Sequence, residues 1–442
     1  MEICVVGAGY VGLTLATCLA KLGHRVVGVE KDPERLEAVR SGTCPFHEPG
    51  LAELLREGMQ HGRLAFTGEF EEAVEGAEVV FCAVGTPSGR NGEVDLSALE
   101  EVVEGLARLR DGERIVAIKS TVPVGTTDRV ARRLRPDGGA PVACTPEFLR
   151  EGSAVLDFFH PHRTVIGTRS PFAAECLKAL FVPLGAPVLL TDPPTAEMIK
   201  YAANAFLATK ISFINEIANL CEHVGADLRT VADGLGLDPR IGPHYLRAGI
   251  GFGGSCLPKD VRALAELARE YLVDPVLLEA VLRVNESQRR RFVDRVEALL
   301  GGLAGKTVAV LGLAFKAGTD DVRESPALAI AERLLARGAS VRAHDPVAAE
   351  AARRRLPALV CFPDPYEATS GSDAVLLLTE WPEYRDLDWH EVRRRVRRPL
   401  VVDGRGMGLT QHLAAAGFRV FEPGSPWRGR HGKWMEEAEW SI

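Results

Sequence analysis

The feature that most restricts the fold is the order of apolar runs and glycines in the first thirty residues. An apolar run at 2–6 precedes three closely spaced glycines, Gly7, Gly9 and Gly12, and a second apolar run follows at 24–30 after an amphipathic stretch. This order predicts a strand, a glycine turn, a helix and a second strand, which together form a βαβ unit. Because the strands of such a unit run parallel, the chain is expected to begin with a parallel sheet.

The pattern changes in the middle of the chain and then returns. Residues 195–224 contain neither proline nor glycine and are predicted to form one long helix, and a second helical stretch runs from 259 to about 300. A glycine-rich hinge at 301–305 precedes a second βαβ unit, which begins with the strand 306–312 and ends with the strand 340–344. Further strands are predicted at 79–84, 115–118, 142–144, 164–166, 374–378 and 400–402. The sequence therefore predicts an α/β fold, with two doubly wound Rossmann-like domains joined by a long-helix central domain.

Length and composition are consistent with three domains in a globular protein. A chain of 442 residues is too long for one core, and we expect boundaries at 1–190, 191–300 and 301–442. The net charge is -7 and no block of like charges occurs, so nucleic-acid binding is not expected. Nine cysteines without a Cys-x-x-Cys pair favour a reducing cytoplasm over a disulfide scaffold. The sequence contains no run of 18 apolar residues, so no membrane span is expected. The first six residues resemble a strand and not a signal peptide.

The first glycine turn matches a dinucleotide-binding fingerprint, in which Tyr10 and Val11 lie between the second and third glycines. Gly7 would allow the tight turn, Gly9 the approach of a pyrophosphate, and Gly12 close packing of helix on strand. Glu30 ends the second strand, where its carboxylate can bind ribose hydroxyls and repel a 2′-phosphate, which favours NAD over NADP. Lys31 and Arg35 lie close by and weaken this preference. An ordinary glycine turn and a solvated glutamate are the alternatives.

A second glycine-rich segment, residues 249–260, carries the most informative cysteine. Four glycines in six residues precede Cys256, and Lys259 and Asp260 follow at the start of a predicted helix. A thiolate is a nucleophile, and a helix N-terminus or a nearby cation lowers the pKa of a cysteine. Cysteines are more often packing residues, as expected for Cys4, Cys18, Cys82 and Cys221 in their apolar runs. The context of Cys256 instead predicts a catalytic nucleophile.

Two polar residues of the long helix share one face. Lys200 and Asn204 are four residues apart, so their side chains project from the same side of the helix. A lysine and an amide in this arrangement can stabilise an alkoxide or a tetrahedral oxyanion. The alternative, taken from these residues alone, is that both are solvated positions on a helix surface.

Several motifs in a fixed order resemble one protein family over nearly the whole chain. They are the glycine fingerprint, Val84-Gly85-Thr86-Pro87, the segment 120–126, the segment 146–152, the segment 197–206, the cysteine loop, Phe315-Lys316 and Arg323-Glu324-Ser325. This set resembles the nucleotide-sugar dehydrogenases, the family of UDP-glucose and GDP-mannose dehydrogenases. The resemblance implies that the domain 1–190 binds NAD, the domain 191–300 forms a dimer, and the domain 301–442 binds the nucleotide of the sugar.

The resemblance also implies a reaction. Family members oxidise a sugar alcohol twice with two NAD molecules, and by this resemblance Cys256 forms first a thiohemiacetal and then a thioester, which water hydrolyses to the carboxylate. Asp260 would assist proton transfer, Glu147 would activate the hydrolytic water, and Thr121 would hold water or cofactor. The implied catalytic residues are Cys256, Lys200, Asn204, Asp260, Glu147 and Thr121. No metal is expected.

Binding residues follow from matching positions. The implied cofactor-binding residues are Gly7, Gly9, Tyr10, Val11, Gly12, Glu30, Lys31, Arg35, Thr86, Pro87, Thr121, Glu151, Lys259 and Arg323. The implied substrate-binding residues are Glu147, Phe148, Leu149, Arg150, Glu151, Lys200, Asn204, Arg240, Tyr245, Arg247, Ile250, Gly251, Phe252, Gly253, Lys316 and Arg405. Arg240 matches an arginine that reaches the nucleotide of a neighbouring subunit, which accords with a homodimer or a larger homo-oligomer.

The sugar nucleotide is expected to be UDP-glucose, with GDP-mannose as the alternative. Arg240-Ile241-Gly242 and Asp403-Gly404-Arg405 resemble the uridine-side enzymes, whereas residues 317–321 resemble the GDP-mannose group. Gly406 follows Arg405 where UDP-glucose enzymes often have asparagine.

Three other classes of protein share parts of this pattern. A single-oxidation alcohol dehydrogenase would not need Cys256, and a 6-phosphogluconate-type dehydrogenase has neither a cysteine loop nor a second Rossmann-like domain. A non-catalytic NAD-binding protein would keep the glycine turn without Lys200, Asn204, Cys256 and Asp260 together.

Overall fold

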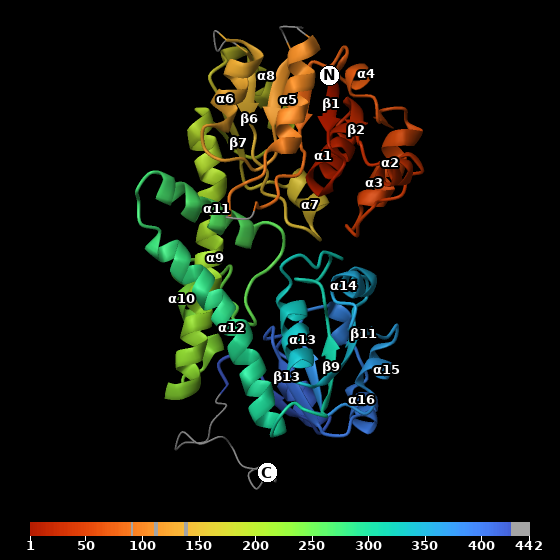
Figure 1. Cartoon of the computed structure of the whole chain (residues 1–442), viewed down its shortest axis with the longest axis vertical. Coiled ribbons are helices and arrows are strands. Elements are labelled where there is room, and N and C mark those ends of the chain that lie inside the picture. The colour runs from red at the N-terminus through yellow and green to blue at the C-terminus, as the bar shows by residue number, and fades with distance from the viewer. Residues whose placement is uncertain (90–91, 110–113, 137–139, 426–442) are drawn as a thin grey trace. The chain divides into compact units, whose positions relative to one another are not determined.

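A computed structural model describes residues 1–89, 92–109, 114–136 and 140–425 of the chain. Contacts divide it into two compact units, the first comprising Met1–Ala203 with Arg262–Leu272, and the second comprising Asn204–Val261 with the chain from Val273 onward. Figure 1 labels the elements along the chain. Two helices, α9 (Pro193–Val224) and α11 (Leu257–Glu270), have residues in both units.

The first unit is built on a sheet that has eight strands within the described residues, in the order β3-β2-β1-β4-β5-β6-β7-β8. The strands are β1 (Glu2–Val6), β2 (Arg25–Val29), β3 (Leu64–Thr67), β4 (Val79–Cys82), β5 (Ile115–Ile118), β6 (Val142–Cys144), β7 (Thr164–Thr168) and β8 (Val188–Thr191). Its helices are α1 (Tyr10–Lys21), α2 (Pro33–Arg40), α3 (Leu51–Gln60), α4 (Phe70–Val74), α5 (Ser97–Leu109), α6 (Thr126–Leu134), α7 (Ala154–Phe159), α8 (Pro171–Phe181) and the short 3-10 helix Val182–Leu184.

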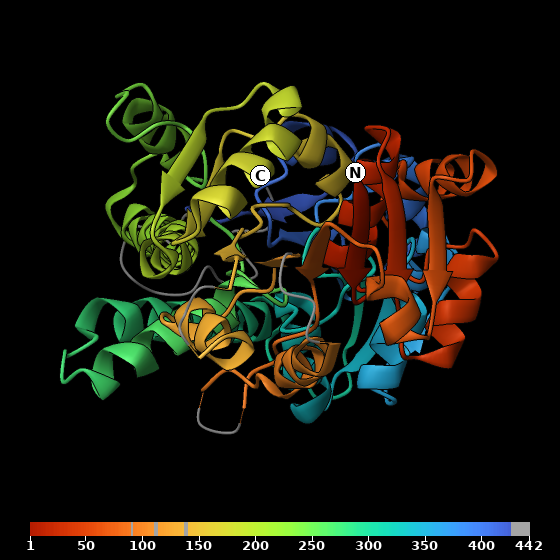
Figure 2. The same ribbon diagram turned by 90° about the horizontal axis from the view of Figure 1, so that it is seen from above.

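Alternate residues of the first strand pack into cores on opposite faces of this sheet. Ile3 and Val5 join a cluster with α1, α3 and α8, whereas Cys4 and Val6 join a second cluster with α4, α5 and α6. Successive side chains of a strand point to opposite faces, so a strand that is buried on both faces needs apolar residues at every position. Figures 1 and 2 show the resulting helices on both faces of the sheet.

The second unit repeats this architecture on a smaller scale. Its sheet has six strands within the described residues, in the order β11-β10-β9-β12-β13-β14, which is the order of the first six strands of the first unit. The strands are β9 (Thr307–Leu311), β10 (Ser340–His344), β11 (Val360–Cys361), β12 (Ala374–Leu377), β13 (Leu400–Asp403) and β14 (Arg419–Phe421). The helices are α10 (Leu228–Gly236), α12 (Val276–Leu300), α13 (Pro326–Ala336), α14 (Ala349–Arg355), α15 (Pro365–Thr369), the 3-10 helix Pro382–Tyr384, α16 (Trp389–Arg395) and α17 (Thr410–Ala415).

The predicted fold class is confirmed, with corrections to individual elements. β6 and β7 pair antiparallel, so the first sheet is not parallel throughout. The predicted helix from 259 to about 300 is two helices, α11 and α12, because Pro275 caps the second one and disfavours helical backbone at Asp274. The strands β3, β8, β11 and β14 and the helix α10 were not predicted. Among the described residues, no helix has both the length and the apolar composition needed to cross a bilayer.

The antiparallel pairing of β7 decides where one loop lies. The chain leaves β6 at the same edge of the sheet at which β7 begins, so residues 145–163 stay at this edge. The parallel strands β1, β4, β5 and β6 also end there. The loop after β6 and the glycine turn after β1 therefore lie at the same, carboxyl edge of the sheet.

The close packing of α1 on the first turn makes a testable prediction about stability. A Cβ at Gly12 would lie 1.8 Å from the carbonyl oxygen of Gly7, whereas one at Gly9 would meet nothing within 4 Å. Gly12→Ala is expected to lower the free energy of unfolding by about 1–3 kcal/mol, because the turn must shift. Gly9→Ala, with the same added methyl group, is expected to change it by less than about 0.5 kcal/mol. Urea unfolding of both variants measures the difference, and equal losses would contradict the packing argument.

Candidate active site

The glycine turn lies at the point where the strand order of the first sheet reverses. β1 lies between β2 and β4, and Gly7 follows β1 with a positive φ of 98°. A Cβ on Gly7 would lie 2.8 Å from the carbonyl oxygen of Ala83, just after β4. Gly9 is the N-cap of α1, and no described side chain caps this helix. The uncapped N–H groups and the open space at Gly9 fit the diphosphate of a dinucleotide.

Glu30 is buried and holds the glycine turn. Its carboxylate accepts hydrogen bonds from the backbone N–H of Ala8 at 3.1 Å and of Asp32 at 2.9 Å, and pairs with Arg35 at 3.2 Å. Only 5% of Glu30 is exposed, which excludes the alternative of a solvated surface residue. Lys31 is exposed and pairs with Glu101 at 2.8 Å. Glu30, at the end of β2, is thus fixed against the glycine turn, and the cations Lys31 and Arg35 lie close to it in the chain.

Two further turns approach the same edge after β4 and β5. The hydroxyl of Thr86 donates a hydrogen bond to the carbonyl oxygen of Thr121 at 2.9 Å, and Pro87 is exposed beside it. The turn after Thr121 is anchored to α9 by the buried carboxylate of Glu197. The Glu197 carboxylate accepts hydrogen bonds from the backbone N–H of Gly125 at 2.5 Å and from the N–H and hydroxyl of Thr127 at 2.8 and 2.6 Å.

A buried ion pair joins the loop after β6 to α9. Lys200 Nζ lies 2.8 Å from Glu147 Oε1, and the Leu149 N–H donates to Glu147 Oε2 at 2.6 Å. Both charged side chains are buried, at 5% and 7% exposure. Removing Glu147 would leave Lys200 without its buried carboxylate partner, a loss that typically costs about 3–5 kcal/mol.

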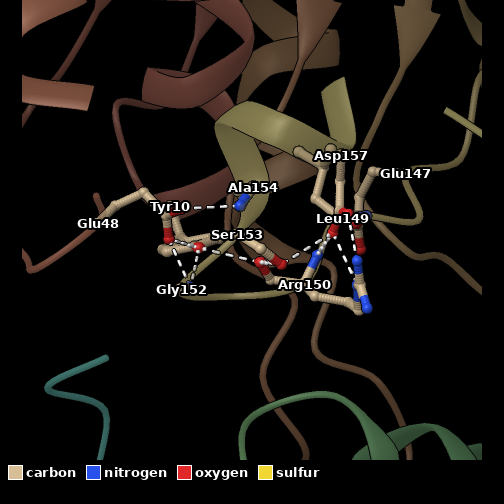
Figure 3. A network of polar contacts seen from close by, with 9 residues as sticks. All are labelled: Tyr10, Glu48, Glu147, Leu149, Arg150, Gly152, Ser153, Ala154 and Asp157. Atoms are coloured by element: carbon tan, nitrogen blue, oxygen red, sulfur yellow. Dashed lines mark hydrogen bonds and ion pairs between the residues drawn. The ribbon is translucent and has the colours of Figure 1, made fainter. Parts of the chain in front are cut away.

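The rest of this loop is held by cations and an acid of the same unit. The guanidinium carbon of Arg163 lies 3.8 Å from the centroid of the Phe148 ring, and Lys200 Nζ lies 5.4 Å from it. Arg150 binds Asp157 through Nε at 3.0 Å and Nη2 at 2.6 Å, as Figure 3 shows. Arg150 is exposed and Glu151 is partly buried.

Lys119 is a buried cation that sequence reasoning did not single out. It follows β5 directly, and its Nζ lies 5.4 Å from the centroid of the Phe181 ring. Burial lowers the pKa of Lys119 to about 8; Glu147 opposes this effect, and Lys200 adds to it. The charge of Glu147 is therefore balanced by more than one lysine. The position of this lysine, directly before Ser120-Thr121, was the one sign in the sequence that it could belong to the site. An apolar run that ends in lysine is common, so this sign does not distinguish a buried lysine from an exposed one.

In the second unit, Cys256 lies at the start of the helix that carries Asp260. The Asp260 N–H donates to the carbonyl oxygen of Cys256 at 2.8 Å, so this cysteine precedes the first turn of α11. Asp260 is 1% exposed; its carboxylate accepts from Asn204 Nδ2 at 2.6 Å and pairs with Lys259 Nζ at 2.7 Å. The Cys256 side chain is exposed and its Sγ lies 3.5 Å from Ser255 Oγ.

Other cysteines have a different environment. Cys4, Cys18, Cys82 and Cys221 are buried, as expected for packing residues. Burial raises the pKa of Cys4, Cys18 and Cys82 to about 12. These thiols are protonated at neutral pH, which leaves them unreactive as nucleophiles.

The glycine loop before Cys256 is held by side chains of α12. Asn285 Oδ1 accepts from the Phe252 N–H at 2.8 Å, and Asn285 and Arg289 donate to the Phe252 carbonyl at 3.0 and 2.8 Å. The Ile250 N–H donates to the Gly404 carbonyl at 2.9 Å. A Cβ on Gly253 would lie 2.3 Å from the carbonyl oxygen of Glu324, so this position requires glycine.

The remaining expected substrate and cofactor residues of the second unit are mostly cationic. Arg405 donates to the carbonyls of Leu378 at 2.7 Å and Phe315 at 2.5 Å, whereas Arg240 and Arg323 are exposed and pair with Asp238 and Asp321. Lys316 and Tyr245 are partly buried, and Arg247 is exposed. Tyr245 has a positive φ of 64°, and Gly251 one of 98°. No group of three or more metal-binding side chains occurs within the described ranges.

An uncapped helix behind a glycine turn, at the switch point of a doubly wound sheet, is where proteins of this fold bind dinucleotides. The fold and this turn therefore define the class as dinucleotide-binding α/β proteins. The chain belongs to the UDP-glucose/GDP-mannose dehydrogenase family. Residues 1–185 match its NAD binding domain, residues 194–287 its central domain and residues 309–408 its UDP binding domain. The chain is therefore an enzyme, and its cofactor is NAD.

Relatives of this family cover nearly the whole chain. A UDP-glucose 6-dehydrogenase of Pseudomonas aeruginosa is 46% identical over 97% of this chain and 98% of its own length. A second, of Bacillus subtilis, is 44% identical over 96% of this chain and 98% of its own length. The solved UDP-glucose dehydrogenase of the hyperthermophilic archaeon Pyrobaculum islandicum is 42% identical and covers 96% of this chain and 97% of its own, with a TM-score of 0.89.

The buried Lys119 makes a prediction about the pH dependence of stability. Its folded-state pKa of about 8 is below the ordinary value of 10.5, so between these values the unfolded chain binds more protons. The free energy of unfolding is therefore expected to rise with pH from 8 to 10, by about 1 kcal/mol per pH unit from this residue. Lys119→Met should lack this slope, whereas Lys178→Met, on the exposed side of α8, should keep it. Urea unfolding at pH 8, 9 and 10 gives the slopes, and identical slopes in all three proteins would contradict the assignment.

Proposed function

We propose that this chain oxidises the primary alcohol of UDP-glucose to the carboxylate of UDP-glucuronate through a cysteine-bound intermediate. The names and nearly full-length similarity of the relatives support the substrate. The observation that carries the mechanism is the pair of contacts on successive turns of α9, Lys200 with Glu147 and Asn204 with Asp260. GDP-mannose, oxidised by the same steps, is the second candidate.

In this proposal the glycine turn and Glu30 hold the dinucleotide. The open space at Gly9 would receive the pyrophosphate, and Glu30, already fixed by Ala8 and Asp32, would accept hydrogen bonds from the ribose. Each NAD, when bound, accepts one hydride from the substrate carbon. In this proposal the domain 1–190 binds NAD, the domain 191–300 forms the dimer and the domain 301–442 binds the nucleotide of the sugar.

The covalent steps belong to Cys256. Its thiolate adds to the aldehyde carbon, forming a C–S bond and a thiohemiacetal, and loss of a second hydride leaves a thioester. Water then adds to the thioester carbon, the C–S bond breaks, and the thiolate and the carboxylate are released. The balanced reaction consumes one UDP-glucose, two NAD and one water, and yields one UDP-glucuronate and two NADH, with release of protons.

The polar pairs stabilise charge and move protons in these steps. Lys200 and Asn204 donate to the oxygen that becomes negative when the thiolate or water adds to the carbonyl. Asp260, held by Asn204 and Lys259, accepts the proton of the alcohol through water, and Glu147 accepts the proton of the hydrolytic water. The buried positions of both carboxylates support this assignment, because bulk water would compete with the proton transfer.

The exposed face of α9 supports a proposed homodimer. Phe206, Phe213, Leu220 and Val224 recur at spacings of seven, seven and four residues and are 65%, 49%, 57% and 74% exposed. Such a stripe costs free energy in water and is typical of a helix that packs on a partner. Ile214 of the same helix is buried in the second unit and does not belong to this stripe.

The first prediction of this function concerns stoichiometry and Cys256. Two NADH should form for each sugar nucleotide consumed, and Cys256→Ala should lower the rate of acid formation by at least about 10³-fold, since no acyl carrier remains. Cys361→Ala, at a partly buried cysteine of β11, is the matched control and should keep the wild-type rate. NADH absorbance and chromatography of the products measure both quantities. One NADH per sugar, or acid formation by Cys256→Ala at the wild-type rate, would exclude the covalent route.

The second prediction concerns the substrate. The value of kcat/KM for UDP-glucose is expected to exceed that for GDP-mannose by at least tenfold, because a buried donor left unpaired by the wrong base costs about 1–3 kcal/mol. A ratio in favour of GDP-mannose would overturn the substrate and leave the steps at Cys256 unchanged.

The third prediction concerns assembly. Light scattering should give a mass of at least two chains of 47.8 kDa. Phe213→Glu, which places a charge in the stripe, should shift the protein toward the single-chain mass. Leu237→Glu, at a residue that is 84% exposed outside the stripe, should not. A wild-type monomer at working concentration would refute the dimer.

A further inference from the structure

A buried glutamate in the first unit connects the glycine turn with the loop after β6. Glu48 lies between α2 and α3 and is 5% exposed. Its Oε1 accepts from the backbone N–H of Ala154 at 2.7 Å, and its Oε2 accepts from that of Gly152 at 2.6 Å and from the hydroxyl of Tyr10. Figure 3 shows these three donors converging on one carboxylate.

Tyr10 brings the glycine turn into this cluster. It is the first residue of α1, directly after Gly9, and its ring centroid lies 5.0 Å from that of Phe46. Its hydroxyl oxygen also accepts from the Gly152 N–H at 3.0 Å and lies 3.5 Å from the carbonyl oxygen of Arg150. A single side chain of the cofactor turn is thus bonded to the loop that carries the expected substrate residues.

Side chains of the first unit anchor the loop at both ends and at Arg150. Glu147 holds the first residues of the loop, because it pairs with Lys200 and accepts from the Leu149 N–H. Asp157 binds the guanidinium of Arg150 and accepts from the backbone N–H of Arg150 at 2.9 Å. Glu48 holds the last residues of the loop, Gly152 and Ala154. A shift of the first turn of α1 is therefore transmitted to residues 147–154 through Tyr10 and Glu48.

The chemistry requires a carboxylate at position 48. Three donors point at its two oxygens, and an ionised carboxylate accepts all of them. A glutamine would present its amide NH₂ group either to the Ala154 N–H, which would lose this acceptor, or to the Gly152 N–H, which would keep only the Tyr10 hydroxyl.

We propose that Tyr10 and Glu48 are positioning residues that couple NAD binding at the glycine turn to nucleotide-sugar binding at the loop 147–151. This inference rests on the proposed function, because it takes UDP-glucose as the ligand of the loop. A dinucleotide on the first turn of α1 restrains Tyr10, and through Glu48 it restrains the loop. The second ligand then orders a loop that has already lost part of its conformational freedom, which lowers the entropic cost of its binding. Each ligand therefore increases the affinity for the other by the same factor.

Calorimetry with UDP-glucose, in the presence and absence of saturating NADH, measures this factor without turnover. In the wild-type enzyme NADH is expected to lower the dissociation constant of UDP-glucose at least about fivefold. Tyr10→Phe, which keeps the ring and removes the hydroxyl, should bring the factor to within twofold of one. Tyr366→Phe is the matched control: its hydroxyl accepts from the Asp388 N–H at 2.9 Å in the second unit, and its loss should leave the factor unchanged.

A second measurement separates positioning from general destabilisation. In Glu48→Gln, hydrogen exchange at the Gly152 and Ala154 amides should become at least about tenfold faster, while exchange in β1 and β4 stays as in the wild type. Faster exchange throughout the first unit, with an unchanged coupling factor in Tyr10→Phe, would reduce both residues to a structural role.

The remaining outcomes distinguish this inference from the function. A wild-type enzyme that oxidises UDP-glucose but shows a factor of one overturns only the coupling. A wild-type enzyme that does not bind UDP-glucose overturns the proposed substrate and the coupling together.

Discussion

Buried carboxylates that accept backbone N–H groups hold the loops at the carboxyl ends of the strands in both units. Glu30 binds the N–H of Ala8, and Glu48 binds those of Gly152 and Ala154. In the second sheet Asp345, at the end of β10, accepts from Leu313 at 2.7 Å and Ala314 at 3.0 Å, in the place that Glu30 takes in the first. Turns that approach a ligand cannot pair their N–H groups within a sheet or helix, so a buried acid that satisfies them also sets their geometry.

The two carboxylates expected to be catalytic are also buried and hydrogen-bonded. Glu147 is fixed by one lysine and one backbone N–H, and Asp260 by one amide and one lysine, and each lies beside a residue of α9. A spacing of four residues along α9 keeps Lys200 and Asn204 on one side of this helix. Cys256, by contrast, is exposed at the start of α11, as the proposed role of a nucleophile requires.

Much of this arrangement could be predicted from local pattern. The βαβ unit at the N-terminus, the second one after residue 306 and the long helix from Pro193 all have the periodicity and the glycine placement of their elements. Short edge strands such as β11, of two residues, carry too little pattern to be detected. The antiparallel direction of β7 was missed because an apolar run does not encode the direction in which a strand pairs.

The sequence by itself determined the fold class and the dinucleotide turn and indicated one candidate cysteine nucleophile, because these depend on residues that are neighbours in the chain. Glycines at fixed spacing set backbone conformation locally, and Cys256 is marked by the residues on either side of it. Only the tertiary structure decided that Glu48 meets Tyr10 and Gly152, that Lys119 is buried and that Lys200 pairs with Glu147, 53 residues away. These contacts join residues far apart in the chain, and a lone acid or lysine has no local pattern that distinguishes a buried partner from a solvated one.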